Sequence, residues 1–130
     1  MSVDLSKYEI VGFVDEKISK LVNIEYTGNI YAAPGVIKHI IKRHKEELSD
    51  SILDNIIDTI KIILNNPQYV GCHEKKKGKG IEFIKVIDDN ILVATELDIK
   101  DGYLYIASMY PIKQAKIDSR LNSGRIQKYT

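Results

Sequence analysis

Two histidines stand five residues apart in the segment GVIKHIIKRHKEEL, residues 35–48. Histidine transfers protons near neutral pH and binds metal ions, so His39 and His44 are the first candidates for chemistry. Two zinc ligands on one helix need a spacing of four residues, whereas a spacing of five separates the side chains by about 140°. Cys72 and His73 do not complete a ligand set. We therefore expect neither a metal site nor another cofactor.

The helical wheel gives the two histidines different surroundings. His44 falls on the apolar side of the expected helix, and His39 points away from it, beside Lys42 and Arg43. His44 is then either a core histidine with hydrogen-bonded ring nitrogens or an acid–base group. His39 is either a surface residue of a basic helix or a second proton-transfer or phosphate-binding group. The helix alone does not choose between these interpretations.

Three polar residues interrupt the apolar side of three expected strands. They are Lys85 in IEFIKVI, Thr95 in ILVATEL and Ser108 in YLYIASMY. A two-residue loop at Asp101-Gly102 would put Thr95 opposite Ser108. A three-residue loop at residues 88–90 would put Lys85 diagonal to Thr95. The sequence therefore predicts a compact polar set on one face of a sheet.

Such a set, with His44 pointing at it, suits phosphoryl transfer without a metal. The histidine would move a proton, and the lysine would stabilise the charged transition state. In the alternative interpretation, Thr95 and Ser108 only hydrogen-bond across the strands, and Lys85 extends its ammonium group to solvent. The residues leave both interpretations open.

The pattern of apolar residues predicts the elements that must position these side chains. A short strand, a short helix and an extended segment around residues 27–29 precede the histidine helix. A second helix is expected from about Asp50 to Asn65, capped by Ser49 or Asp50 and stopped by Asn66-Pro67. Strands are then expected in QYVGCHE, IEFIKVI, ILVATELDI and YLYIASMYP. This order predicts an α+β fold with helices on one face of an antiparallel sheet.

The length and composition of the chain favour one soluble domain, residues 1–130, in a reducing and cytoplasmic setting. One cysteine excludes an intramolecular disulfide, and no apolar run approaches the ~20 residues of a membrane span. The net charge is only +1, but residues 103–130 hold five basic residues against one acidic residue. The lysine-rich stretch KKKGKG, residues 75–80, is either a contact to phosphates or a solvated turn. Uneven charge of this kind can build a basic surface on a nearly neutral protein.

From residue 30 to residue 128 the chain resembles a phage- and mobile-element-associated branch of the barnase–EndoU–colicin–RelE-like nuclease superfamily. The resemblance rests on IYAAPGVIKHIIKRH, NNPQYVG, IEFIKVI, GYLYIASMYPI and KIDSRLNSGRI, in that order. It implies N-terminal helices packed on a four-stranded antiparallel sheet. It also implies metal-independent RNA cleavage, in which the ribose 2′-hydroxyl attacks the adjacent phosphate and leaves a 2′,3′-cyclic phosphate. Members act as toxins or effectors, tRNA is a frequent target, and a cognate inhibitor is an implied partner.

The resemblance also assigns candidate catalytic residues by position. His39 and His44 match the helix histidines, Ser108 matches a hydroxyl residue late in the sheet, and Arg120 matches the basic residue after it. We infer that His44 acts as base or acid, that Ser108 positions the phosphate, and that Lys85, Lys116 or Arg120 neutralises it. Because the two histidines diverge on the wheel, we favour His44 if only one of them is catalytic.

Further residues are expected to bind the substrate. Lys116 is a weaker match to the basic residues of the family, and Lys113 and Thr95 complete the polar surroundings. Tyr103 and Tyr105 lie on the strand phase opposite Ser108, where an exposed ring could stack on an unpaired base. The competing hypothesis for the whole chain is a non-catalytic RNA- or protein-binding module on the same fold.

Overall fold

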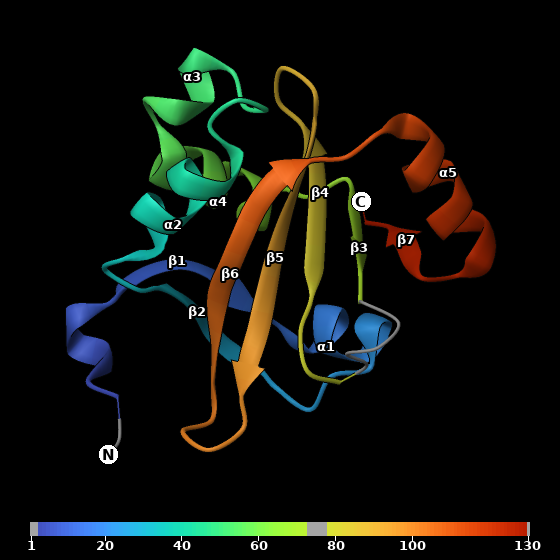
Figure 1. The fold of residues 1–130 in the computed structure, drawn as a ribbon. Coiled ribbons are helices and arrows are strands. Elements are labelled where there is room, and N and C mark those ends of the chain that lie inside the picture. Colours follow the sequence, from blue (N-terminus) through green and yellow to red (C-terminus); the bar gives the residue numbers. More distant parts are fainter. Residues whose placement is uncertain (1–2, 73–77, 130) are drawn as a thin grey trace.

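The structure is a computed structural model that describes residues 3–72 and 78–129. It contains a seven-stranded sheet flanked by helices (Figure 1). The strands are β1 (Glu9–Val14), β2 (Gly28–Ala32), β3 (Tyr69–Gly71), β4 (Glu82–Val86), β5 (Asn90–Asp98), β6 (Tyr103–Pro111) and β7 (Ile126–Lys128). The helices are α1 (Glu16–Val22), α2 (Val36–His44), α3 (Asp50–Leu53), α4 (Ile56–Asn65) and α5 (Gln114–Ser123), and a short 3-10 helix covers Leu5–Lys7. The predicted α+β class is confirmed.

The prediction of a four-stranded antiparallel sheet is wrong. The strand order is β1-β2-β6-β5-β4-β3-β7. β3 to β6 form the predicted meander, but β1 and β2 add to one side of it and β7 to the other. β2 runs parallel to β6, with Ile30 opposite Leu104. This pairing joins segments far apart in the sequence, so no local pattern of residues could indicate it.

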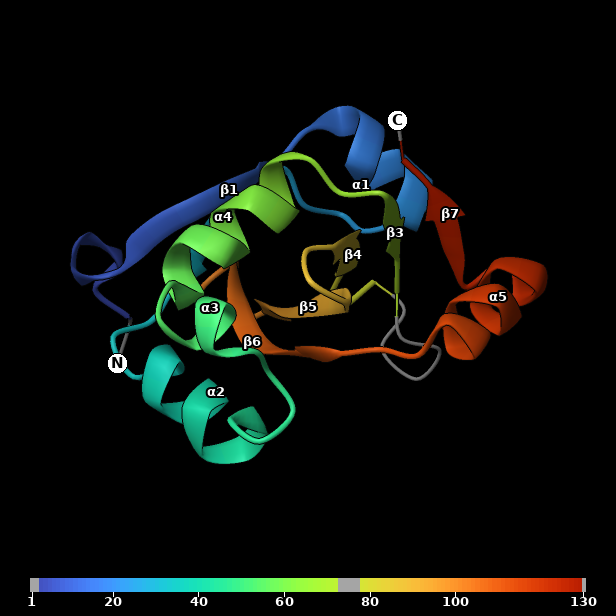
Figure 2. The same cartoon turned by 90° about the horizontal axis from the view of Figure 1, so that it is seen from above.

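The two faces of the sheet are covered differently. On one face, which we call the helix face, Phe83, Val93 and Ile106 pack in a large core with residues of α1 to α4. On the other face, which we call the α5 face, Ile84 and Leu92 pack around Ile117 of α5. Figure 2 shows α4 and α5 on opposite sides of the central strands. The sequence missed α5, because this helix buries only one residue.

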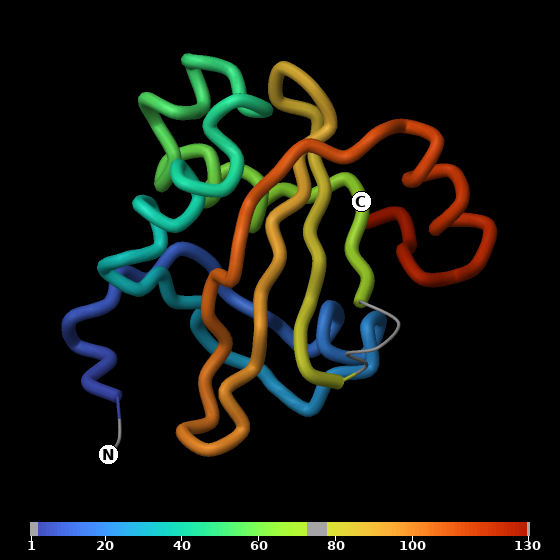
Figure 3. Tube along the Cα trace, viewed as in Figure 1, coloured from blue at the N-terminus to red at the C-terminus, as the bar shows by residue number. Residues whose placement is uncertain are grey.

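The β5–β6 hairpin has a different register from the predicted one. Asp98 pairs with Tyr103, so the loop contains four residues, 99–102, instead of two. Asp98 closes this loop by accepting the Asp101 N–H on its side chain and the Gly102 N–H on its carbonyl, at 2.9 and 2.7 Å. Figure 3 shows the loop at the end of the hairpin away from α5.

A β-bulge changes the register of the hairpin a second time. Ala94 pairs with Ser108 and Thr95 pairs with Ile106, which leaves Ala107 as an extra residue on β6. The predicted pair of Thr95 and Ser108 is therefore wrong. Because neighbouring residues of a strand alternate between faces, Ser108 lies on the α5 face and Thr95 on the helix face.

The β4–β5 turn also differs from the prediction. Val86 pairs with Asn90, so the loop is 87–89, and Lys85 pairs with Ile91 instead of Val93. Thr95 lies four positions after Ile91 on β5, which places Lys85 about 13 Å from Thr95 along the strand. The expected polar set of Lys85, Thr95 and Ser108 does not exist.

The helices that lead into the sheet were predicted more closely. Ser49 caps α3 by accepting the Ile52 N–H at 3.3 Å, and α4 ends before Asn66-Pro67, both as predicted. The single helix expected over 50–65 is interrupted at Asp54 and gives α3 and α4. No helix within residues 3–72 and 78–129 is long and apolar enough to cross a membrane.

Candidate active site

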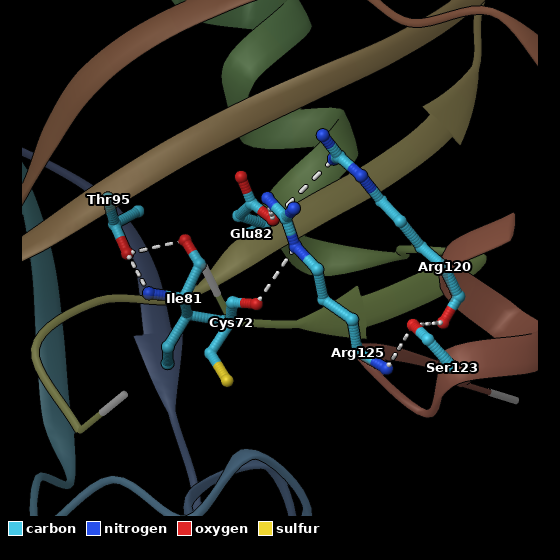
Figure 4. Close-up of polar contacts among 7 residues, drawn as sticks. All are labelled: Cys72, Ile81, Glu82, Thr95, Arg120, Ser123 and Arg125. Atoms are coloured by element: carbon cyan, nitrogen blue, oxygen red, sulfur yellow. Dashed lines mark hydrogen bonds and ion pairs between the residues drawn. The ribbon is translucent and has the colours of Figure 1, made fainter. Parts of the chain in front are cut away.

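Three charged side chains from separate parts of the chain meet on the α5 face (Figure 4). The carboxylate of Glu82, the first residue of β4, accepts a hydrogen bond from Arg125 Nη2 at 3.0 Å. The same carboxylate oxygen lies 3.7 Å from Arg120 Nη1. Glu82 is 5% exposed, so a carboxylate largely removed from water is compensated by two cations. The cluster keeps an excess of positive charge.

The turn between α5 and β7 holds Arg125 in position. Gly124 ends α5 in the left-handed conformation, with φ of 81°, which glycine adopts without strain. Arg125 Nε donates to the Cys72 carbonyl at 3.2 Å, and the Arg125 N–H donates to Ser123 Oγ at 3.3 Å. A Cβ at Gly71 would collide with the Arg125 carbonyl oxygen. Gly71 thus allows β7 to approach β3 closely enough to bring Arg125 to Glu82.

A cavity of about 110 Å³ opens beside Glu82. It is lined by Gly80, Ile81, Glu82, Ala94, Thr95, Glu96 and Tyr110. Glu82 belongs both to the arginine cluster and to the wall of this cavity. A small group that enters the cavity therefore meets a carboxylate held by two guanidinium groups.

Ser108 lies in line with Glu82 across the sheet. Glu82 pairs with Ala94 on β5, and Ala94 pairs with Ser108 on β6. Within the described residues, Ser108 Oγ and Arg120 Nη1 are buried and make no hydrogen bond. Buried polar atoms normally have partners, so the α5 face holds two donors without one beside Glu82.

His44 reaches the site through Tyr110. Its ring centroid lies 5.3 Å from that of Tyr110, with an angle of 34° between the planes. The His44 side chain is 20% exposed, and its Nδ1 lies 3.4 Å from Glu47 Oε1. The predicted inward orientation of His44 is confirmed, and His39 is exposed on the other side of α2, as the wheel indicated.

Two residues of the expected polar set have other surroundings. The Thr95 hydroxyl donates to the Ile81 carbonyl at 2.9 Å and accepts the Ile81 N–H at 3.0 Å, so it ties β5 to the segment before β4. Lys85 is partly buried and lies on the helix face, away from Glu82. The α5 face therefore gathers Ser108 and Arg120 around Glu82, and Lys85 does not join them.

Residues 8–119 match the family described as phage-Barnase-EndoU-ColicinE5/D-RelE like nuclease3. The chain belongs to this nuclease family. The resemblance seen in the sequence is thereby confirmed at the level of the family. No curated protein and no solved structure matches the chain. Because the family match ends at residue 119, the placement of Arg120 and Arg125 beside Glu82 rests on the structure.

In this member of the nuclease family, the bulge at Ala107 also moves the tyrosines. It places Tyr103 and Tyr105 on the same face as Ser108, although their spacing in the sequence predicted the opposite face. The Tyr105 hydroxyl donates to Glu96 Oε2 at 2.9 Å. Burial, followed by this hydrogen bond, raises the pKa of Tyr105 to about 12. Tyr103 is buried beside Tyr105, with 5.7 Å between ring centroids.

The remaining predicted residues lie on α5 or outside the described part of the chain. Lys113 occupies the N-cap position of α5 without a side-chain capping bond, and Lys116 lies in the first turn; both are exposed. His73 and lysines 75–77 of the KKKGKG stretch lie outside the described residues. Within residues 3–72 and 78–129, no three His, Cys, Asp or Glu side chains form a group that could hold a metal ion.

Reasoning from the sequence missed Glu82, Arg125 and Tyr110. Glu82 is the acidic residue in IEFIKVI, on the strand phase opposite Lys85, and no feature of its local sequence marks it. Arg125 stands in the GRI ending that marked the family resemblance, which was the available signal for it. Tyr110 was read as part of an apolar strand.

Proposed function

We propose that this chain is a metal-independent endoribonuclease that cleaves RNA by attack of the ribose 2′-hydroxyl on the adjacent phosphate. The proposal is carried by one observation: Arg120 and Arg125 converge on the buried carboxylate of Glu82 beside an open cavity. Membership in a nuclease family supports a nucleic acid as the substrate.

The arginines would bind the scissile phosphate. A guanidinium group presents paired N–H donors that match phosphate oxygens, and it remains charged at any relevant pH. Arg120 Nη1 makes no hydrogen bond within the described residues and can donate to the phosphate without breaking one. As the 2′-oxygen bonds to phosphorus, negative charge develops on the equatorial oxygens, and two nearby cations stabilise it. Ser108 Oγ would add a further hydrogen bond.

Glu82 and His44 would transfer the protons. Glu82 would accept the proton of the 2′-hydroxyl, because the carboxylate lines the cavity next to the phosphate-binding arginines. The bond from phosphorus to the leaving 5′-oxygen then breaks, and that oxygen takes up a proton. His44 would donate this proton from the side of the cavity formed by Tyr110. The products are a 2′,3′-cyclic phosphate and a 5′-hydroxyl.

The proposal includes a toxin-like role, with tRNA among the candidate targets and a cognate inhibitor in the producing cell. Its support is the family match to phage-associated nucleases. An active enzyme of this kind should be hard to produce in bacteria, and a Glu82→Gln variant should be easier to produce.

Incubation of the purified chain with total RNA and with tRNA, in the presence of EDTA, tests the reaction. We expect cleavage with cyclic-phosphate ends, and its loss in His44→Ala and in Glu82→Gln. RNA that stays intact at near-stoichiometric enzyme would refute the proposal. RNA binding without turnover would favour the non-catalytic module instead.

A further inference from the structure

Three basic residues lie in a row along α5 and continue the charge of the arginine cluster. At 100° per residue, Lys113, Lys116 and Arg120 fall within about 60° of one another on the helix. Arg120 extends from this side of α5 to Glu82 (Figure 4). The row, which we call the α5 stripe, therefore borders the candidate active site.

The acidic residue of α5 does not neutralise this stripe. Asp118 points about 160° away from Arg120 around the helix. Its Oδ1 accepts a hydrogen bond from Gln114 Nε2 at 3.0 Å, and Gln114 Oε1 accepts one from Asn90 Nδ2 at 3.1 Å. This opposite side of α5 thus faces the β4–β5 turn.

The two lysines of the stripe are available to a ligand. Lys113 and Lys116 are exposed and form no ion pair within residues 3–72 and 78–129. Together with Arg120 and Arg125 they make four cations against the single carboxylate of Glu82. A helix rises about 1.5 Å per residue, so the stripe extends about 10 Å from Arg120 to Lys113.

The acidic residues near the cavity indicate which way a bound strand would run from the active site. Glu96 lines the cavity two residues beyond Ala94 on β5, towards the 99–102 loop at the end of the hairpin away from α5 (Figure 3), and Asp98 lies further towards that loop. Phosphates flanking the scissile one would be repelled by these carboxylates and attracted by the lysines. A strand bound in the cavity is therefore drawn along α5.

We propose that the α5 stripe binds the phosphates on one side of the cleaved bond, so that the substrate is an RNA strand extending several nucleotides beyond the active site. This inference rests on the proposed function, since it uses the same cavity. Lys113 and Lys116 contact phosphates only, and they contribute affinity without base preference.

A salt titration of binding separates this proposal from the reaction itself. The probe is a 2′-deoxy octanucleotide, which the proposed mechanism cannot cleave. For the wild type, log affinity should fall linearly with log salt, and Lys113→Gln/Lys116→Gln should make that slope shallower by about 1.4. The double variant Lys7→Gln/Lys20→Gln removes the same charge from exposed positions outside the stripe and should keep the wild-type slope.

A length series supplies the second measurement. With RNA, kcat/KM should be higher for an octanucleotide than for a dinucleoside monophosphate, which has no flanking phosphate. Lys113→Gln/Lys116→Gln should reduce this advantage by roughly tenfold. If the double variant loses equal factors of kcat/KM on both substrates, or keeps the wild-type salt slope, the stripe is not a phosphate-binding site. If the salt slope changes as expected but no RNA is cut, the proposed reaction fails and the phosphate-binding stripe stands.

Discussion

The guanidinium of Arg125 donates a hydrogen bond to the Glu82 carboxylate, with 3.0 Å between Nη2 and Oε1. The two residues lie at the starts of two strands of the same sheet: Glu82 is the first residue of β4, and Arg125 directly precedes β7. β3 lies between these strands and is paired with both. The contact across β3 therefore couples the position of the carboxylate to the packing of the C-terminal strand.

Removing the carboxylate tests this contact. Glu82→Gln keeps an oxygen acceptor for Arg125 but cannot take a proton, so RNA cleavage should fall by about 100-fold or more. Glu82→Ala leaves the two guanidinium groups without their partner and should lower the free energy of unfolding by about 1–3 kcal/mol. Urea unfolding and kcat/KM on an oligoribonucleotide measure the two effects. Full activity in folded Glu82→Gln would exclude Glu82 as the base.

The two histidines of α2 should respond differently to the same substitution. His44→Ala removes the ring that contacts Tyr110 and should reduce cleavage by about 100-fold. His39 is exposed on the opposite side of α2, and His39→Ala should change the rate by about twofold or less. His39→Ala also serves as the control for losing a histidine from this helix. Equal losses in the two variants would contradict the division of roles.

The elements of the fold could be predicted from the sequence better than their register. The strands of the meander and the capped helix start at Ser49 follow from local patterns of two and 3.6 residues. The loop closed by Asp98 and the bulge at Ala107 shift pairing by one or two residues. The two-residue shift leaves side chains on their faces, whereas the extra residue at the bulge moves Ser108 to the face opposite Thr95, so the expected meeting of these two residues failed.

The site depended on contacts that no local pattern encodes. The inward side of His44 followed from the helical wheel, but its partner Tyr110 depends on where β6 ends. Glu82 and Arg125 come together only because β3 pairs with both β4 and β7. Arg120 was identified from the family resemblance, and its approach to Glu82 required α5, a helix that its own sequence barely indicates.

Substitutions of Thr95 test whether its role is structural or substrate-binding. Its hydroxyl makes two hydrogen bonds with the Ile81 backbone in a buried position, so Thr95→Val should destabilise the fold by about 1–3 kcal/mol. Thr95→Ser keeps the hydroxyl and should lose less. Urea unfolding gives both values. A Thr95→Val protein as stable as wild type but impaired in RNA binding would return Thr95 to the substrate-binding residues.

Alkaline pH should weaken the sheet through Tyr105. Burial and the hydrogen bond to Glu96 raise the pKa of its phenol from the ordinary value of 10.0 to about 12. A group whose pKa is raised in the folded state favours folding in its protonated form. The contribution of Tyr105 is therefore fully present below pH 10 and is lost as the pH rises towards about 12.

Urea unfolding across this pH range measures the effect. The unfolding free energy of the wild type should fall more steeply than that of Tyr105→Phe, which lacks the ionisable hydroxyl. Ultraviolet phenolate absorbance of the folded protein should show one fewer late-titrating tyrosine in the variant. Tyr103, whose pKa burial also raises to about 12, should continue to titrate late in both proteins. Identical pH slopes for the wild type and Tyr105→Phe would show that folding does not raise the pKa of Tyr105.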